Sequence, residues 1–269
     1  MSKRRGSHPI QREWAVLMKQ EARFRKKRLS AGPSRLEETL SERIPEKLEE
    51  TLYKAFSKAF ALVFHKGAGL IEKTYSKDRR RAEYLEAARV ARERQDRASY
   101  RTFSLRARNR SAGHVLFAGV EGVGLGLLGI GLPDIPLFSA VLLRSMYEIA
   151  MSYGFDYKSP EEQRFILLVI EAALLDGDDH PPADEALNHW IDWGKTPTLS
   201  QQEQIDRCAH ALANSMLYMK FVQGIPLVGA LGGLSDGVCL HKVTEYAKIK
   251  YKRRFLRQGM ALHPSSKLD

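Results

Sequence analysis

The chain of 269 residues contains only two cysteines, Cys208 and Cys239, which lie far apart in apolar surroundings. Two such thiols do not form a disulfide framework and are typical of buried side chains in a reducing compartment. The N-terminus also lacks the apolar stretch of a secretory signal. We therefore expect a protein that is made in the cytoplasm and stays there.

Motifs for catalysis, metal binding and nucleotide binding are missing as well. A G-x-G-x-x-G pattern occurs at 124–129, but neither a preceding strand nor β-α-β alternation accompanies it, so a dinucleotide site is not expected. The segment 176–197 reads as an acidic loop, and it matches neither an EF-hand nor an H-E-x-x-H helix. A G-x-S-x-G nucleophile elbow is also lacking. The sequence thus indicates no catalytic residues, no metal site and no cofactor.

Lysine and arginine are absent from residues 112–143, although the net charge of the chain is +11. This segment must be buried in a protein core or in a lipid interface. It is glycine-rich, as is 224–237, and glycines four residues apart allow helix backbones to approach closely. We therefore expect the two segments to pair as a central helical hairpin. The glycines assigned to this packing are Gly122, Gly124, Gly126, Gly129, Gly131, Gly229, Gly233 and Gly237.

Spanning a bilayer takes about 20 predominantly apolar residues. Glu121 interrupts the first glycine-rich segment, and the second is uncharged only over 221–235, so a buried core or a shallow insertion is favoured. Glu121 and Asp134 then need polar partners, of which Arg144 is the nearest in sequence. With Glu148 they form a candidate polar core, which is either a structural ion-pair cluster or a functional site.

Helical periodicity and capping signals dominate the remaining chain, and few segments alternate with a period of two, so the fold class is predicted to be all-α. Capping boxes begin at Ser159 and at Ser200. Residues 70–110 should form a solvated helix followed by a tethering loop. The other predicted helices cover 35–43, 45–65, 137–153, 160–175, 201–221 and 238–258.

Positive charge is concentrated in three segments, 1–35, 77–110 and 242–257, and it implies an anionic partner. By contrast, 156–206 holds twelve acidic residues against three basic ones. Residues 10–29 are either a disordered basic tail or an amphipathic helix with a cationic face. In the second case, the side chains expected to face lipid are Trp14, Phe24, Arg25, Lys26, Lys27 and Arg28.

Several segments together resemble the EcsC protein family over about residues 34–258. They are AGVEGVGLG at 118–126, GLPDIPLF at 131–138, LRSMYE at 143–148, YGFD at 153–156, IPLVGA at 225–230, VTEYA at 243–247 and YKRRFL at 251–256. The resemblance implies a bacterial, all-α, membrane-proximal accessory protein, because the family is named after a locus that also encodes an ABC transporter. It supplies no catalytic residues.

The predicted organisation is a basic N-terminal segment at 1–33, a single helical domain at 34–258 with the central glycine-rich hairpin, and a C-terminal tail at 259–269. The favoured function is a non-enzymatic accessory protein, cytoplasmic and peripheral to the inner membrane. Its expected partner is an anionic membrane surface or a membrane protein, and nucleic acid is disfavoured because base-stacking aromatic residues are few. The alternative is an enzyme that acts on a lipid or another amphiphile through the buried carboxylates Glu121, Asp134 or Glu148 around the glycine-rich core.

Overall fold

The computed structural model describes residues 8–30, 46–66, 76–111, 134–222 and 234–262. These residues form α-helices and one short 3-10 helix, and they contain no strand, so the predicted all-α class is confirmed. The elements are α1 (Pro9–Leu29), α3 (Glu46–Lys66), α5 (Lys77–Arg94), α6 (Arg97–Ser111), α7 (Asp134–Ser152), α8 (Pro160–Leu174), η2 (Gly177–Asp179), α9 (His180–Trp193), α10 (Gln201–Val222) and α11 (Leu234–Leu262).

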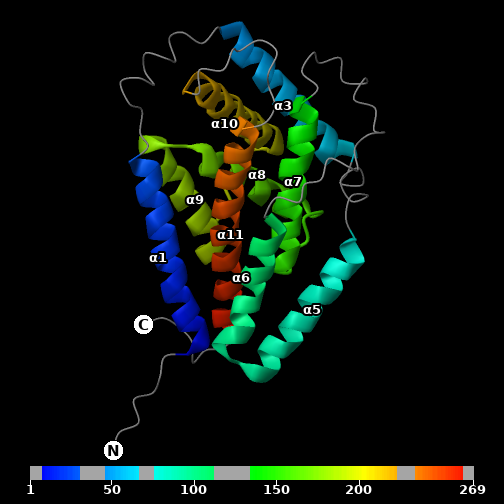
Figure 1. Cartoon of the computed structure of the whole chain (residues 1–269), viewed down its shortest axis with the longest axis vertical. Coiled ribbons are helices and arrows are strands. Elements are labelled where there is room, and N and C mark those ends of the chain that lie inside the picture. Colours follow the sequence, from blue (N-terminus) through cyan, green and yellow to red (C-terminus); the bar gives the residue numbers. More distant parts are fainter. Residues whose placement is uncertain (1–7, 31–45, 67–75, 112–133, 223–233, 263–269) are drawn as a thin grey trace, which may run out of the picture.

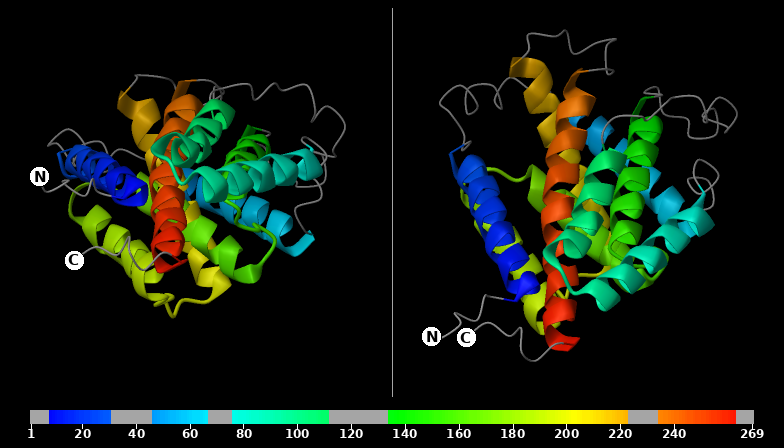
Figure 2. Two further views of the ribbon diagram at one scale, coloured as in Figure 1. Left: turned by 90° about the horizontal axis from the view of Figure 1, so that it is seen from below. Right: turned by 60° about the horizontal axis from the view of Figure 1, so that its bottom comes forward.

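The long helix α11 runs through the middle of the bundle, and the other helices surround it (Figures 1 and 2). It contacts α1, α6, α7, α8, α9 and α10. The second central element is α8, in which every residue from Phe165 to Leu174 is buried. A helix that is apolar on all sides is stable only when neighbours cover it, and α9, α10 and α11 pack against α8 here. The two helices therefore define the core.

Local sequence explains where several helices begin. At α10, the backbone amide of Glu203 donates to Ser200 Oγ at 3.2 Å, and the amide of Ser200 donates to Glu203 Oε2 at 2.7 Å, which completes the predicted capping box. At α8, Ser159 Oγ accepts from the amide of Glu162 at 3.1 Å. The carboxylate of Glu162 does not return to Ser159, because it bonds to α11 instead.

The predicted acidic loop over 176–197 is wrong, because 180–193 forms helix α9. Proline in its first turn lacks only an amide that would have no helical partner. Ala183, Leu187 and Trp190 recur at helical spacing and are buried against the core. The high acid content concealed this apolar face. The helix ends at Gly194, whose φ of +68° is the left-handed conformation that glycine adopts readily.

The tethering loop predicted after the first part of 70–110 is also wrong, because α6 occupies 97–111. Asp96 begins this helix by accepting from the amide of Ser99 at 2.7 Å and from its hydroxyl at 2.6 Å. Tyr100, Phe103 and Ala107 then form a narrow buried face. The arginines of α6 lie on its other sides, so composition alone gave the appearance of a polar linker.

Both predicted boundaries of the domain move outward. Helix α1 packs on α11, α6 and α9, so no domain boundary lies at residue 33. At the other end, α11 continues to Leu262, beyond the predicted end at 258. Ile10, Leu17 and Met260 belong to one buried cluster, which joins the two ends of the chain. Residues 8–30 are therefore part of the helical domain.

The glycine-rich hairpin and the helix predicted at 35–43 lie outside the described residues, except for Gly237. This glycine sits in α11, and no atom of the described residues lies within 4 Å of a Cβ added there. Its predicted partner segment lies outside the described residues, so its close packing stays a prediction. The other seven glycines of the prediction fall outside the described ranges.

Candidate anion-binding groove

Helix α1 turns its apolar side toward the protein. Trp14 and Phe24 were expected to face lipid, but both are buried, and so is Arg28, whose Nη1 lies 2.9 Å from Asp176 Oδ1. Trp14 also lies beneath the guanidinium groups of Arg253 and Arg257. The prediction is wrong for these three residues, because this side of α1 packs against α11 and its neighbours and not against lipid. Arg25, Lys26 and Lys27 are exposed as expected.

Several cations of the basic C-terminal segment also point inward. Lys250 is fully buried, and its Nζ contacts the carboxylates of Glu21 and Asp184, the latter at 2.6 Å. Arg253 bridges Glu21 at 2.6 Å and Asp192 at 2.5 Å. Positive charge at 242–257 is therefore largely used to hold α1 and α9 against α11, and only part of it faces solvent.

Burial and neighbouring cations shift the pKa values of these carboxylates in opposite directions. Burial alone would raise the pKa of Asp184, but the ammonium group of Lys250 and the hydroxyl of Tyr246 more than offset it, so this pKa is lowered. Asp192 follows the same pattern beside Arg253 and Arg257, and its pKa is also lowered. At Glu162 burial prevails over Arg254 and Tyr251, so its pKa is raised.

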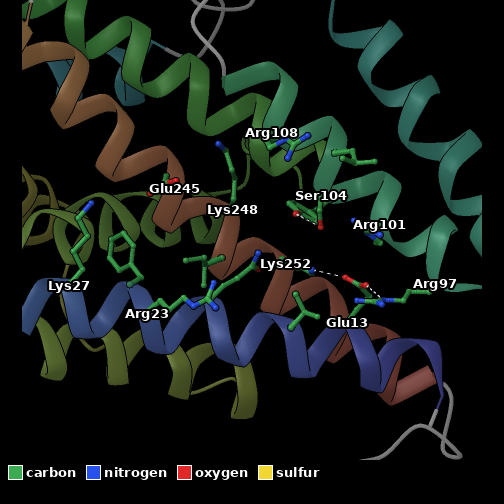
Figure 3. A pocket seen from close by; sticks show the side chains of 16 residues that line it. Glu13, Arg23, Lys27, Arg97, Arg101, Ser104, Arg108, Glu245, Lys248 and Lys252 are labelled. Atoms are coloured by element: carbon green, nitrogen blue, oxygen red, sulfur yellow. Dashed lines mark hydrogen bonds and ion pairs between the residues drawn. The ribbon is translucent and has the colours of Figure 1, made fainter. Parts of the chain in front are cut away.

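A groove of about 530 Å³ lies between α1 and α6, with α11 along its floor (Figure 3). Seven cationic side chains line it, against two carboxylates. The cations are Arg23 and Lys27 from α1, Arg97, Arg101 and Arg108 from α6, and Lys248 and Lys252 from α11. Cationic side chains held in a partly enclosed space create a positive potential that attracts anions.

The two ends of this groove differ in charge balance. At one end, Glu13 is buried and accepts from Arg97 Nε at 2.7 Å and from Lys252 Nζ at 2.8 Å. Burial opposes ionisation of Glu13, but these hydrogen bonds lower its pKa, so at this end one carboxylate is shared by two cations. Toward the other end the one carboxylate is that of Glu245, which is exposed and lies 3.6 Å from His241.

Three cations of the groove lack a counter-ion among the described residues. In the described ranges, no carboxylate lies within ion-pair distance of Arg23, Lys27 or Arg101. The half-buried Lys248 has a lowered pKa, because burial disfavours its charge more than the nearby carboxylate of Glu245 favours it, and Arg108 adds a smaller repulsion. A site with uncompensated positive charge and partial burial is suited to bind an anion.

The sequence-predicted polar core is only partly within the described structure. Arg144 Nε lies 3.3 Å from Glu148 Oε1 on the same helix, and Arg80 of α5 approaches the same oxygen at 3.8 Å. This cluster joins α5 to α7 and does not line the groove. Glu121 and the side chain of Asp134 lie outside the described residues, so convergence of the three carboxylates stays a prediction.

Sequence reasoning missed the groove, although one signal was present. Arg97, Arg101, Leu105 and Arg108 follow one another at helical spacing and therefore share one face of α6. That face is evident only if 97–111 is taken as a helix. The partners of α6 across the groove come from α1 and α11, which are remote in the sequence.

The polar residues of 176–197, which the sequence predicted to be an acidic loop, take part in separate contacts. Asp176 pairs with Lys242 of α11, whereas His180 is buried and its Nδ1 bonds to the carbonyl of Ala172 at 2.9 Å. Within the described ranges, no group of His, Cys, Asp and Glu side chains could hold a metal ion. In the same part of the chain, no helix combines the length and apolar character needed to cross a membrane.

Comparison with known proteins gives a consistent result. The sequence model of the EcsC protein family matches residues 11–256, which include nearly all of α1 and most of α11. The chain is 29% identical over 150 residues to Protein EcsC of Bacillus subtilis (strain 168), covering 52% of this chain and 58% of that protein. The alignment thus spans little more than half of its relative. No solved structure matches the chain. Because the family match covers most of its length, the chain belongs to the EcsC protein family.

Proposed function

We propose that this protein is a non-enzymatic accessory protein that binds peripherally to an anionic membrane surface, on the cytoplasmic side of the bacterial inner membrane. The observation that supports the proposal is the charge balance of the groove between α1, α6 and α11, where seven cationic side chains face two carboxylates. Each Lys or Arg held near anionic lipid contributes about 1 kcal/mol.

The surface beside the groove has the same sign of charge. Arg25 and Lys26 continue the cationic side of α1 and are exposed. Binding of this kind would place the α1–α6 face against the bilayer and leave the buried apolar residues of α1 in the protein core. It differs from an inserted amphipathic helix, whose apolar face has to enter the lipid.

A membrane protein is the partner that fits this location. The name of the family comes from a locus that also encodes an ABC transporter, so a transporter subunit is the partner we include in the proposal. The groove face would then act as the contact with the membrane, and other surfaces would remain available for the protein partner.

The proposal is tested by sedimentation of the full chain with liposomes, with and without anionic lipid, at low and at high salt. We expect binding to anionic vesicles that weakens as salt rises, because salt screens exposed charges. Equal binding to neutral vesicles, or no binding to either kind, would contradict the proposal.

A double variant identifies the surface involved. Lys27→Gln with Arg101→Gln removes two exposed cations of the groove, and vesicle affinity should fall about tenfold or more. The matched control is Lys58→Gln with Lys195→Gln, which removes two exposed cations outside the groove lining. The control should retain nearly the full affinity, and an equal loss in both variants would assign binding to net charge alone.

A further inference from the structure

We propose that the groove between α1, α6 and α11 is a discrete binding site for one phosphate-bearing amphiphile, a lipid whose headgroup carries a phosphate. This inference rests on the proposed membrane function and deepens it. The proposed function needs only a nonspecific attraction of cations to an anionic membrane surface. The groove, by contrast, would bind a single lipid molecule at a saturable site.

The dimensions of the groove suit a small molecule. Ligand sites typically enclose about 300–1,000 Å³, and this groove measures about 530 Å³. All seven of its cationic side chains come from the three helices α1, α6 and α11 (Figure 3). Side chains on helices are held in place more closely than those on loops, so the cations are positioned before a ligand arrives.

The cations of the groove that have no carboxylate partner among the described residues favour a phosphate group as the anion. Arg101 supplies a planar guanidinium, which matches the oxygen atoms of a phosphate in a bidentate manner. Lys248 adds an ammonium group that is half-buried, so its interaction with an anion is less screened by water. In the described part of the chain neither has a carboxylate partner within ion-pair distance. A phosphate placed between them would provide the missing counter-charge.

Apolar side chains in the groove indicate that the ligand also has an apolar part and is therefore an amphiphile. Val16, Leu105 and Ile249 line the groove between the cations, and Leu105 is 43% exposed although it is large and apolar. Covering such a side chain with the first carbon atoms of a lipid chain is favourable at about 25 cal/mol per Å². A free phosphate would leave this apolar surface in water.

The groove fits nucleic acid less well. Binding of single-stranded nucleic acid uses exposed aromatic rings on which bases stack. The aromatic side chains of the groove, Phe24 and Tyr153, are both buried. The hydroxyl of Tyr153 is directed to Ser104 Oγ at 3.4 Å, which keeps its ring in the packed floor.

The test is isothermal titration calorimetry of the full chain with soluble probes. Dihexanoyl phosphatidic acid carries a phosphate and two short tails, dihexanoyl phosphatidylcholine is the zwitterionic control, and glycerol 3-phosphate lacks the tails. We expect saturable one-to-one binding of the first probe and at least tenfold weaker binding of the other two. Equal binding of glycerol 3-phosphate would overturn the amphiphile assignment and indicate a soluble phosphate ester.

Lys248→Met is the decisive variant because it removes the charge and keeps the length of a half-buried side chain. Its lowered pKa means that burial disfavours the ammonium group, so the variant should fold at least as stably as the parent. Loss of a hydrogen bond to a charged group should weaken phosphatidic acid binding about tenfold or more. Lys26→Met, an exposed cation of α1 outside the groove lining, is the control and should change affinity less than about twofold.

Leu105→Asn tests how much apolar contacts contribute to lipid binding. The side chain of Leu105 is exposed, so its replacement leaves the core intact. The short-chain lipid should bind severalfold more weakly, whereas weak binding of glycerol 3-phosphate should not change. Tighter binding of a single-stranded oligonucleotide, lost in Lys248→Met, would assign the groove to nucleic acid. Failure of all soluble probes with intact binding to anionic vesicles would overturn this site and leave the peripheral membrane function standing.

Discussion

At the scale of single residues, the most informative side chain is Lys250. Its ammonium group is buried among Glu21 of α1, Asp184 of α9 and Asn188, and it lies 5.0 Å from the ring centroid of Tyr246. A buried charge is tolerated only with close partners of opposite sign. The residue therefore positions three helices relative to one another.

Replacing this lysine tests that interpretation. Lys250→Met keeps the volume but leaves Glu21 and Asp184 without their common partner, so the free energy of unfolding should fall by about 3–5 kcal/mol. Urea unfolding followed by circular dichroism measures the change. Arg89→Met removes an exposed cation that pairs with Glu86 and Glu93, and it should cost no more than about 1 kcal/mol. A similar small loss in both variants would show that the buried cluster does not hold the helices together.

At the scale of secondary-structure elements, α1 is the helix whose role changes most between sequence and structure. Its sequence resembles a membrane-binding amphipathic helix, yet its apolar side is covered by the bundle. Glu13 and Glu21, on the same side, bind cations of α11 and α6. A helix that inserted into lipid would have to release both carboxylates, so the docked position is favoured by charge as well as by burial.

Tryptophan substitutions distinguish a docked α1 from a free one. Trp14→Ala should lower the free energy of unfolding by about 3–5 kcal/mol, because the indole is only 7% exposed. Trp193→Ala, at the end of α9, is the matched control, since its side chain is 63% exposed and its removal should change stability by about 0.5 kcal/mol or less. If Trp14→Ala were as mild as the control in thermal or urea unfolding, α1 would not be part of the folded core.

At the scale of the whole molecule, the charge blocks of the sequence complement one another. The acidic segment 156–206 supplies partners for the basic α11, such as Glu162 for Arg254 and Asp192 for Arg257. This pairing removes much of the positive charge of α11 from the surface. Among the described residues, Arg23, Lys27 and Arg101 have no carboxylate within ion-pair distance, and all three lie along the groove between α1, α6 and α11.

This pairing predicts how stability depends on pH. Glu13, Asp184 and Asp192 have a lowered pKa, so their contribution is complete above the ordinary values of 4.5 and 3.8 and is lost as pH falls through the lower folded-state values. Glu162 and Glu171 have a raised pKa and act in the opposite direction, since acid relieves the cost of burying their charge. Burial lowers the pKa of His180, so this side chain costs stability as pH falls below its ordinary value of 6.5 and opposes the effect of the two glutamates. We therefore expect the steepest fall in the free energy of unfolding below about pH 4, where Glu13, Asp184 and Asp192 become protonated.

Urea unfolding at a series of pH values measures this profile. Asp184→Asn should flatten the acid limb, because the side chain can no longer be protonated. Asp179→Asn, an exposed carboxylate of η2, should keep the parent profile. A profile that does not become steeper below about pH 4 would show that the carboxylates with a lowered pKa do not behave as described.

The sequence alone predicted much of the helical framework. The capping residues at Ser159 and Ser200, the periodicity of 45–65 and the family resemblance all correspond to what the structure and the comparisons contain. It missed α6 and α9, since each carries a narrow apolar face among many charges. Composition averages over all sides of a helix, whereas burial of a helix depends on one side.

The sequence by itself determined the all-α class, the start of several helices such as α8 and α10, and the excess of positive charge, because these depend on neighbouring residues or on composition. Only the tertiary structure decided which charges are buried and which line the groove. Lys250 and Glu21 are 229 positions apart, and the groove unites cations from three separate helices. No local pattern specifies such partners, since each helix has several polar sides and the packing of the whole bundle selects the one that faces inward.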